Sequence, residues 1–128
     1  MVLRIDFSQV PELEVIPTGV YPAVITHVEL RESKSGPDPY LNWTFEVTHP
    51  EYLGRKVWLI TGLGVRALWK LRETLEALGI ESDGAIDFDP EAVVGRRCLV
   101  VVSQEVYNGV TRNRVDSVLP PSKTQEIR

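Results

Sequence analysis

Residues 55–79 restrict the fold most strongly, because they hold the clearest helical pattern in the chain. Within them Leu68, Leu71, Leu75 and Leu78 recur at spacings of three and four residues. At about 100° per residue, this spacing predicts an amphipathic helix with one buried face. Gly79 follows directly and can adopt the left-handed conformation in which many helices end. Since the rest of the chain has the composition of strands and turns, the sequence predicts a mainly-β domain with one helix.

The other side chains of this helix are expected to lie outside the core. Trp69, on the flank of the leucine stripe, is expected to cover the edge of the core. The predicted solvent side consists of Arg66, Lys70, Arg72, Glu73 and Glu76.

Strand patterns account for most of the remaining chain. Predicted strands cover residues 20–31, 40–48, 55–60, 96–107 and 110–119. Alternation over 40–48 assigns Leu41, Trp43, Phe45 and Val47 to the core. Pro22 and the mixed parity of the apolar residues after it indicate a bend or bulge in the first strand. The Asn108-Gly109 pair between two strand segments is a strong signal for a tight hairpin.

The connecting segments complete a single domain of 128 residues. Residues 1–19 are interpreted as an N-terminal arm with a short strand at 3–7, and residues 120–128 as a tail. Residues 32–39 have the polar composition of an exposed turn. Asp89 and Pro90 predict a capped short helical turn before the fourth strand.

Three strands, a helix and two strands follow one another along the chain. This is the order of the OB-fold, a five-stranded Greek-key barrel with the helix between strands 3 and 4. The alternative is an open α+β arrangement with the helix on one face of the sheet. Spacing alone does not prove the strand order, so both remain open.

Signals for catalysis and for metal or cofactor binding are weak. His27 and His49 lie far apart and lack cysteine partners, so no metal site is expected. The glycines at 62 and 64 lack the rest of a phosphate-binding motif. Cys98 lies in an apolar run and is expected to be a buried structural thiol. We therefore expect a non-enzymatic protein without a cofactor.

Composition points to a soluble protein. No apolar run reaches the roughly 20 residues of a membrane span, the start lacks a signal peptide, and a single cysteine fits a reducing cytoplasm. The formal net charge is −4, but it is unevenly distributed. Acidic residues gather between 81 and 91, whereas Arg96, Arg97, Arg112 and Arg114 lie in the strands that follow. A local basic face on an acidic protein is compatible with this pattern.

Seven short motifs occur in an order that resembles a family of small phage-encoded proteins, regarded as similar to single-stranded-DNA-binding proteins. They are IDFSQV, PTGVY, ESKSG, YLGRKVW, LEALG, FDPEAVVGRRC and VVSQEVYNGVTRNRV. The resemblance implies an OB-type fold and a role beside phage DNA replication or recombination, in the host cytoplasm. Bacterial single-strand binders end in an acidic tail that recruits partners. Here Lys123, Glu126 and Arg128 form no acidic run, which puts recruitment through the tail in doubt.

Binding of a single strand requires aromatic rings for base stacking and cations that follow the phosphates. In the OB-fold both lie on the face of strands 2 and 3 and on the loops joining strands 1 to 2 and 4 to 5. If Val57 and Leu59 point inward on strand 3, Lys56 and Trp58 point outward. The predicted DNA-binding residues are Lys34, Tyr40, Lys56, Trp58, Tyr107, Arg112 and Arg114.

Each of these assignments has a structural alternative. Trp58 shares its parity with Ile60, and a register slip of one residue would bury the indole. Tyr40 and Tyr107 can be ordinary half-buried ends of strands. Arg112 and Arg114 can pair with Glu105 and Asp116 across the hairpin.

Two functional hypotheses follow. The first is a single-stranded-DNA-binding protein without sequence preference, whose partners would include replication or recombination proteins. The second is a protein-interaction or assembly module on the same barrel, whose exposed aromatic residues contact another protein and whose net charge of −4 opposes nucleic-acid binding. An oligosaccharide binder is a distant third. A homo-oligomer is compatible with either of the first two, and no membrane partner is expected.

Overall fold

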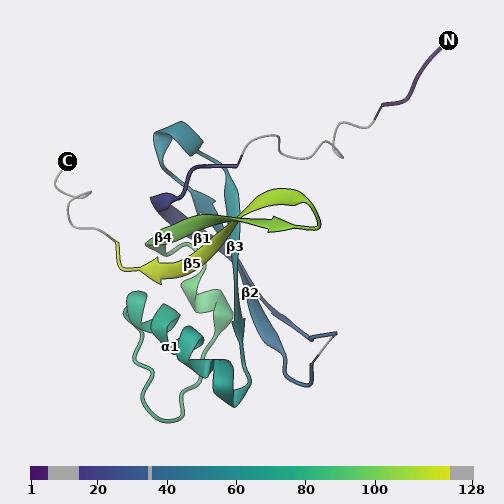
Figure 1. The fold of residues 1–128 in the computed structure, drawn as a ribbon. Helices are drawn as coiled ribbons and strands as arrows, with labels where there is room; N and C mark the ends of the chain where they lie inside the picture. Colours follow the sequence, from purple (N-terminus) through teal and green to yellow (C-terminus); the bar gives the residue numbers. More distant parts are fainter. Residues whose placement is uncertain (6–14, 35, 122–128) are drawn as a thin grey trace.

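The computed structural model describes residues 1–5, 15–34 and 36–121. Within them the strands are β1 (Gly19–Arg31), β2 (Tyr40–Val47), β3 (Lys56–Gly62), β4 (Arg97–Tyr107) and β5 (Val110–Leu119). The helix α1 (Leu68–Ala77) lies between β3 and β4 (Figure 1). Short 3-10 helices occupy η2 (Pro50–Tyr52), η3 (Val65–Ala67) and η4 (Pro90–Val93). The predicted order of three strands, a helix and two strands is confirmed.

The strands form an antiparallel sheet in the order β3-β2-β1-β4-β5. The long strand β1 is central, because its first half pairs with β4 and its second half with β2. The pairing with β2 shifts between Ile25 and His27, so the predicted bulge exists but lies after Ile25. Burial changes parity there, from Ala23 and Ile25 to Val28. The bulge bends β1, so that its two halves pair with different strands, β4 and β2.

The sheet is open among the described residues, because no backbone pairing joins β3 to β5. The predicted closed barrel is therefore not confirmed. Prediction and structure agree on a mainly-β fold with five strands and one helix. The two outer strands nevertheless lie close to each other, and α1 contacts both of them. Figure 1 shows α1 at one end of the sheet, below β5.

The core forms around β2 as the alternation predicts. Trp43, Phe45 and Val47 are fully buried, and Leu41 nearly so. The indole of Trp43 stacks on Phe45 and Phe88, at centroid distances of 6.4 Å and 6.2 Å. Its Nε1–H donates to the hydroxyl of buried Thr61, at 2.9 Å. The one polar atom of the indole is thus satisfied inside the core, as burial requires.

The end of α1 confirms the predicted glycine stop. Gly79 has a φ of +80°, its N–H donates to Glu76 O, and the N–H of Ile80 donates to Leu75 O. This is the Schellman arrangement, in which Ile80 folds back onto the core. Arg96 adds a hydrogen bond of 2.8 Å to the carbonyl of Leu78, and so ties the helix end to the start of β4.

The buried face of α1 departs from the predicted stripe at its start. Leu75 and Leu78 are buried and Leu71 partly so, but Leu68 is 42% exposed. Leu68 is the first residue of the helix, and Ala67 rather than Leu68 fits against the end of β3. A Cβ placed on Gly62 would lie 2.9 Å from the Ala67 methyl, so Gly62 is required by this close approach. Fully buried Thr74 completes the face, with its hydroxyl donating to the carbonyl of Lys70.

Part of the N-terminal arm belongs to the core. Ile16 is 1% exposed, and its backbone N–H and C=O are both bonded to the side-chain amide of Asn113 on β5, at 2.9 Å each. The side-chain amide of Gln104 donates a second hydrogen bond to the Ile16 carbonyl. The predicted strand at 3–7 is absent from residues 1–5, and its last two residues lie outside the described part, as do residues 122–128 of the predicted tail. Within the described residues, Ile16 therefore bonds the arm to both strands of the β4–β5 hairpin.

Three further local predictions are confirmed. Asn108 and Gly109 have φ values of 51° and 78°, as a tight hairpin turn with two left-handed residues requires. Asp89 caps η4 by accepting from the N–H of Glu91 at 3.0 Å. Cys98 is buried, and burial raises the pKa of its thiol to about 12, which keeps it protonated at neutral pH. None of the helices in the described residues is long and apolar enough to cross a membrane.

Replacing Leu75 by Ala should reduce the free energy of unfolding by about 2 to 5 kcal/mol, because it empties a position in the core. Leu71→Ala should cost less, since this side chain is only partly buried. Chemical denaturation measures both changes. Leu30→Ala is the control: it is 64% exposed and should change stability by less than about 0.5 kcal/mol. A loss below about 1 kcal/mol for Leu75→Ala would place α1 off the core.

Candidate functional site

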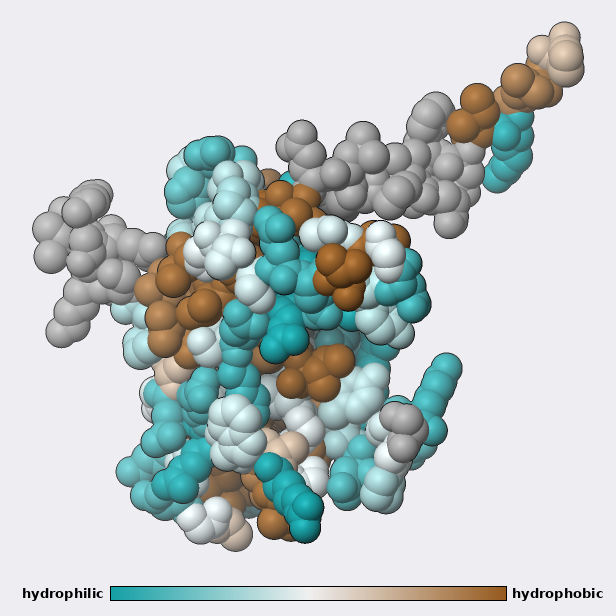
Figure 2. Space-filling view, viewed as in Figure 1, coloured by the Kyte–Doolittle hydropathy of each residue, from teal (hydrophilic) through white to brown (hydrophobic). Residues whose placement is uncertain are grey.

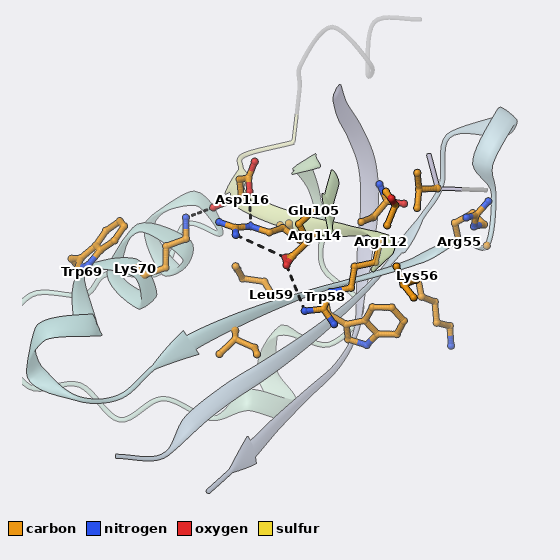
Figure 3. A pocket seen from close by; sticks show the side chains of 17 residues that line it. Arg55, Lys56, Trp58, Leu59, Trp69, Lys70, Glu105, Arg112, Arg114 and Asp116 are labelled. Atoms are coloured by element: carbon orange, nitrogen blue, oxygen red, sulfur yellow. Dashed lines mark hydrogen bonds and ion pairs between the residues drawn. The ribbon is translucent and has the colours of Figure 1, made fainter. Parts of the chain in front are cut away.

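An open groove with a volume of about 1110 Å³ runs between β3 and β5 and reaches the first turn of α1. Two tryptophans line it, Trp58 from β3 and Trp69 from α1 (Figure 3). Its carboxylates are Glu105 and Asp116. Its cations are Arg55, Lys56, Lys70, Arg112 and Arg114. On a chain with a net charge of −4, this excess of cations makes the groove a local basic face.

Strand β3 presents its tryptophan to the groove because of its register with β2. Val57 pairs with Phe45 and Leu59 with Trp43, so both face the core and are almost completely buried. The residues between them therefore face outward, and Trp58 is 49% exposed. The outward parity predicted for Lys56 and Trp58 is confirmed. Ile60, on the same face, is 60% exposed.

Strand β5 supplies Arg112 and Arg114 from the opposite side of the groove. Both side chains are more than half exposed, and both are ion-paired with Glu105 of β4, at 3.5 Å and 3.9 Å. Arg114 Nε also donates to Asp116 Oδ1 at 2.9 Å. Figure 3 shows Glu105 between the two guanidinium groups. The pairing considered from the sequence is therefore present, and the arginines occupy the groove as partly neutralised cations.

A β-bulge brings Asp116 into this network. The register of β4 and β5 shifts between Val101 and Val102, which leaves Asp116 without a partner residue on β4. Its carboxylate accepts from Arg114 and from the Ser103 hydroxyl, and its backbone carbonyl accepts from Lys70 Nζ. Bulges commonly redirect a side chain in this way. Here the bulge connects β5 to the first turn of α1.

The other predicted binding residues lie outside this groove. Tyr40 is half-buried at the start of β2 and lines a smaller hollow of about 540 Å³ with Val65 and Arg66, which shares only Ile60 with the groove. Tyr107 is 55% exposed, and the guanidinium of Arg112 covers one face of its ring at 4.3 Å. Lys34 is exposed in the loop before β2 and lines neither hollow. The structure thus brings together Lys56, Trp58, Arg112 and Arg114 of the predicted set.

Two groove residues on α1 were assigned differently from the sequence. Trp69 was expected at the edge of the core but is 64% exposed, and Lys70 was expected in solvent but is only 18% exposed. The helical angle already places Trp69 about 160° from Leu71, on the polar side, and this signal could have identified it. Lys70 could not have been identified in this way, because its burial depends on the bulge of β5.

The groove has the groups for binding an anionic ligand with flat apolar parts. Guanidinium and ammonium groups bind phosphates, and exposed indole rings stack on planar groups. Among the described residues no group of three or more His, Cys, Asp or Glu side chains is placed to hold a metal ion. His49 serves a local role instead, since its Nδ1 accepts from the N–H of Glu51 as the cap of η2.

Fold and groove together define a small mainly-β protein with a basic groove flanked by tryptophans. The chain belongs to the family described as "Protein of unknown function (DUF669)", whose model matches residues 3–126. No curated protein matches the chain. The family description states no activity, so function has to be argued from the groove.

Proposed function

We propose that the protein binds single-stranded DNA in the groove between β3 and β5, without sequence preference and without catalysing a reaction, and that it acts in phage-type DNA replication or recombination. One observation carries the proposal. Trp58 and Lys56 on β3 face Arg112 and Arg114 on β5 across a single open groove. Stacking on an indole and charge attraction to phosphates are the two interactions that hold single strands with little dependence on base identity.

The geometry of the sheet supports the same proposal. The order β3-β2-β1-β4-β5 would become an OB-type barrel if β3 paired with β5, and these two strands lie close together. In that fold, oligonucleotides bind on the face that includes strand 3 and beside the hairpin of strands 4 and 5. The groove shares β3 and the β4–β5 hairpin with that face, although no residue of β2 lines it. We therefore propose that the open sheet is a member of the OB type whose ligand lies along the unpaired β3–β5 seam.

A protein-interaction module is the competing proposal, and one observation favours it. Ile60, which is 60% exposed, lines the groove with the two tryptophans and also lines the smaller hollow with Val65, which is 87% exposed. In the space-filling view, separate apolar patches lie among hydrophilic residues (Figure 2). Exposed apolar surface of this kind commonly marks contacts with other proteins. The cations of the groove favour DNA over this alternative.

Tryptophan fluorescence separates the two proposals. Trp43 is fully buried, so quenching by a ligand would report on Trp58 and Trp69. Titration with an oligothymidylate at low salt should quench the fluorescence, and added salt should reverse the effect. Absence of any change at all ratios would reject DNA binding and move the assignment to a protein-interaction module.

Trp58→Ala should weaken oligothymidylate binding by about 1 to 3 kcal/mol, the contribution of one base platform, with little loss of stability. The reason is that half of its surface is exposed in the groove. Fluorescence anisotropy of a labelled oligonucleotide measures affinity, and denaturation measures stability. Leu53→Ala, at another exposed apolar position that does not line the groove, is the control. Unchanged affinity with a stability loss of about 3 to 5 kcal/mol would instead identify Trp58 as a core residue.

Arg112→Ala and Arg114→Ala should each reduce the salt dependence of binding while the fold stays intact. Each phosphate contacted on a single strand contributes about −0.7 to the slope of log affinity against log salt, so losing one contact should flatten the slope by up to that amount. Arg72→Ala is a matched control, because Arg72 is also exposed and ion-paired but lies outside the groove. An affinity that does not vary with salt would contradict phosphate contacts in the groove.

Glu105→Gln should tighten binding, because it removes the carboxylate that Arg112 and Arg114 share, although Arg114 keeps its bond to Asp116. Exposed ion pairs contribute about 0.2 to 1 kcal/mol each, so a gain of about 1 kcal/mol, or about fivefold in affinity, is expected. Asp83→Asn removes the same charge outside the groove and should have little effect. Weaker binding by Glu105→Gln would show that the carboxylate positions the arginines for the ligand.

A further inference from the structure

Trp69 is an exposed aromatic ring that contributes nothing to the core. It lies in the first turn of α1, on the side opposite the buried leucines, and is 64% exposed. An indole is among the largest apolar groups that a protein can expose. Its apolar surface contributes favourable free energy only when another group covers it and removes it from water. Within the described residues the ring lies against Lys70, whose Nζ is 5.6 Å from the ring centroid.

The turn that carries Trp69 is held firmly against β5. Lys70 Nζ donates to the carbonyl of Asp116 in the bulge and forms an ion pair with Glu73 at 3.2 Å. Only 18% of the Lys70 side chain is exposed. Since Trp69 is the neighbouring residue, its ring projects from an anchored position, which lowers the entropy lost when a ligand stacks on it.

Trp58 and Trp69 lie on opposite sides of Arg114 and Glu105 in the groove, with Lys56 and Arg55 beyond Trp58. Figure 3 shows Trp69 on the helix on one side and Trp58 on β3 on the other, with Arg114 and Glu105 between them. A platform, a cation and a second platform therefore follow one another along one surface. This order matches a polymer in which planar bases alternate with charged links, and a single small planar ligand would not need it.

We propose that Trp69 is a second base platform, and that a bound single strand runs from β3 over Arg114 onto the first turn of α1. This inference rests on the proposed function and gives the path of the ligand in the groove. It also implies a minimum length: an oligonucleotide that reaches only one tryptophan uses one platform, whereas a longer one uses both.

The test is a comparison of Trp58→Ala, Trp69→Ala and the wild type over a length series of oligothymidylates, from about 4 to about 16 nucleotides, the range of site sizes for one OB-type domain. Trp69→Phe retains a flat ring and should restore most of the affinity lost in Trp69→Ala. Leu53→Ala is the control for loss of an exposed apolar side chain outside the groove. Denaturation midpoints should be unchanged, because Trp69 is not part of the core.

Affinity of the wild type should rise with length until both platforms are reached. Beyond that length, Trp69→Ala should bind about 5- to 150-fold more weakly than the wild type and lose the gain with length. Equal affinity of Trp69→Ala and wild type at every length, with Trp58→Ala still impaired, would overturn the second platform and leave the proposed function intact. Absence of wild-type binding at every length would overturn both.

Discussion

Burial of the alternate side chains of β2 is the constraint on which the groove depends. Trp43 and Phe45 are completely enclosed, and the Trp43 N–H is bonded to Thr61 of β3. A one-residue slip of β3 would break this bond and turn every β3 side chain to the other face. Burial of Trp43 therefore determines the orientation of Trp58: Trp58 faces the groove because Trp43 and its partner Leu59 face the core.

The second constraint is the bulge in β5. By displacing Asp116 from the β4–β5 pairing, it provides a carbonyl for Lys70 and a carboxylate for Arg114. The first turn of α1 is thereby bonded to the hairpin. Glu105 and Asp116 also hold the arginines in place while partly neutralising them. The proposed binding of single-stranded DNA would therefore be of moderate affinity and sensitive to salt, because a phosphate would compete with carboxylates already present.

Much of the fold could be predicted from local patterns. The alternation of β2, the glycine after α1, the Asp89 cap and the Asn108-Gly109 turn each depend on neighbours in sequence, and all were found as expected. Four of the seven predicted binding residues line the groove, and two of them, Lys56 and Trp58, followed from parity once Val57 and Leu59 were taken to point inward. The predicted burial of Leu68 was wrong, because the spacing of apolar residues along a helix does not show where the core ends. Ile16 was missed because its partners, Asn113 and Gln104, lie about 90 residues or more away, as their sequence separations of 97 and 88 show.

The sequence by itself determined the types of the main elements, their order and the inward or outward side of the residues of β2. These properties follow from the periods of 2 and 3.6 residues, which are fixed by backbone geometry within a few neighbours. Only the tertiary structure decided that Tyr40, Tyr107 and Lys34 lie apart from the groove, that Trp69 and Lys70 belong to it, and that the sheet stays open. The reason is physical: the groove forms between β3 and β5, two strands distant in sequence, and its shape depends on how far each bends and where a bulge interrupts it.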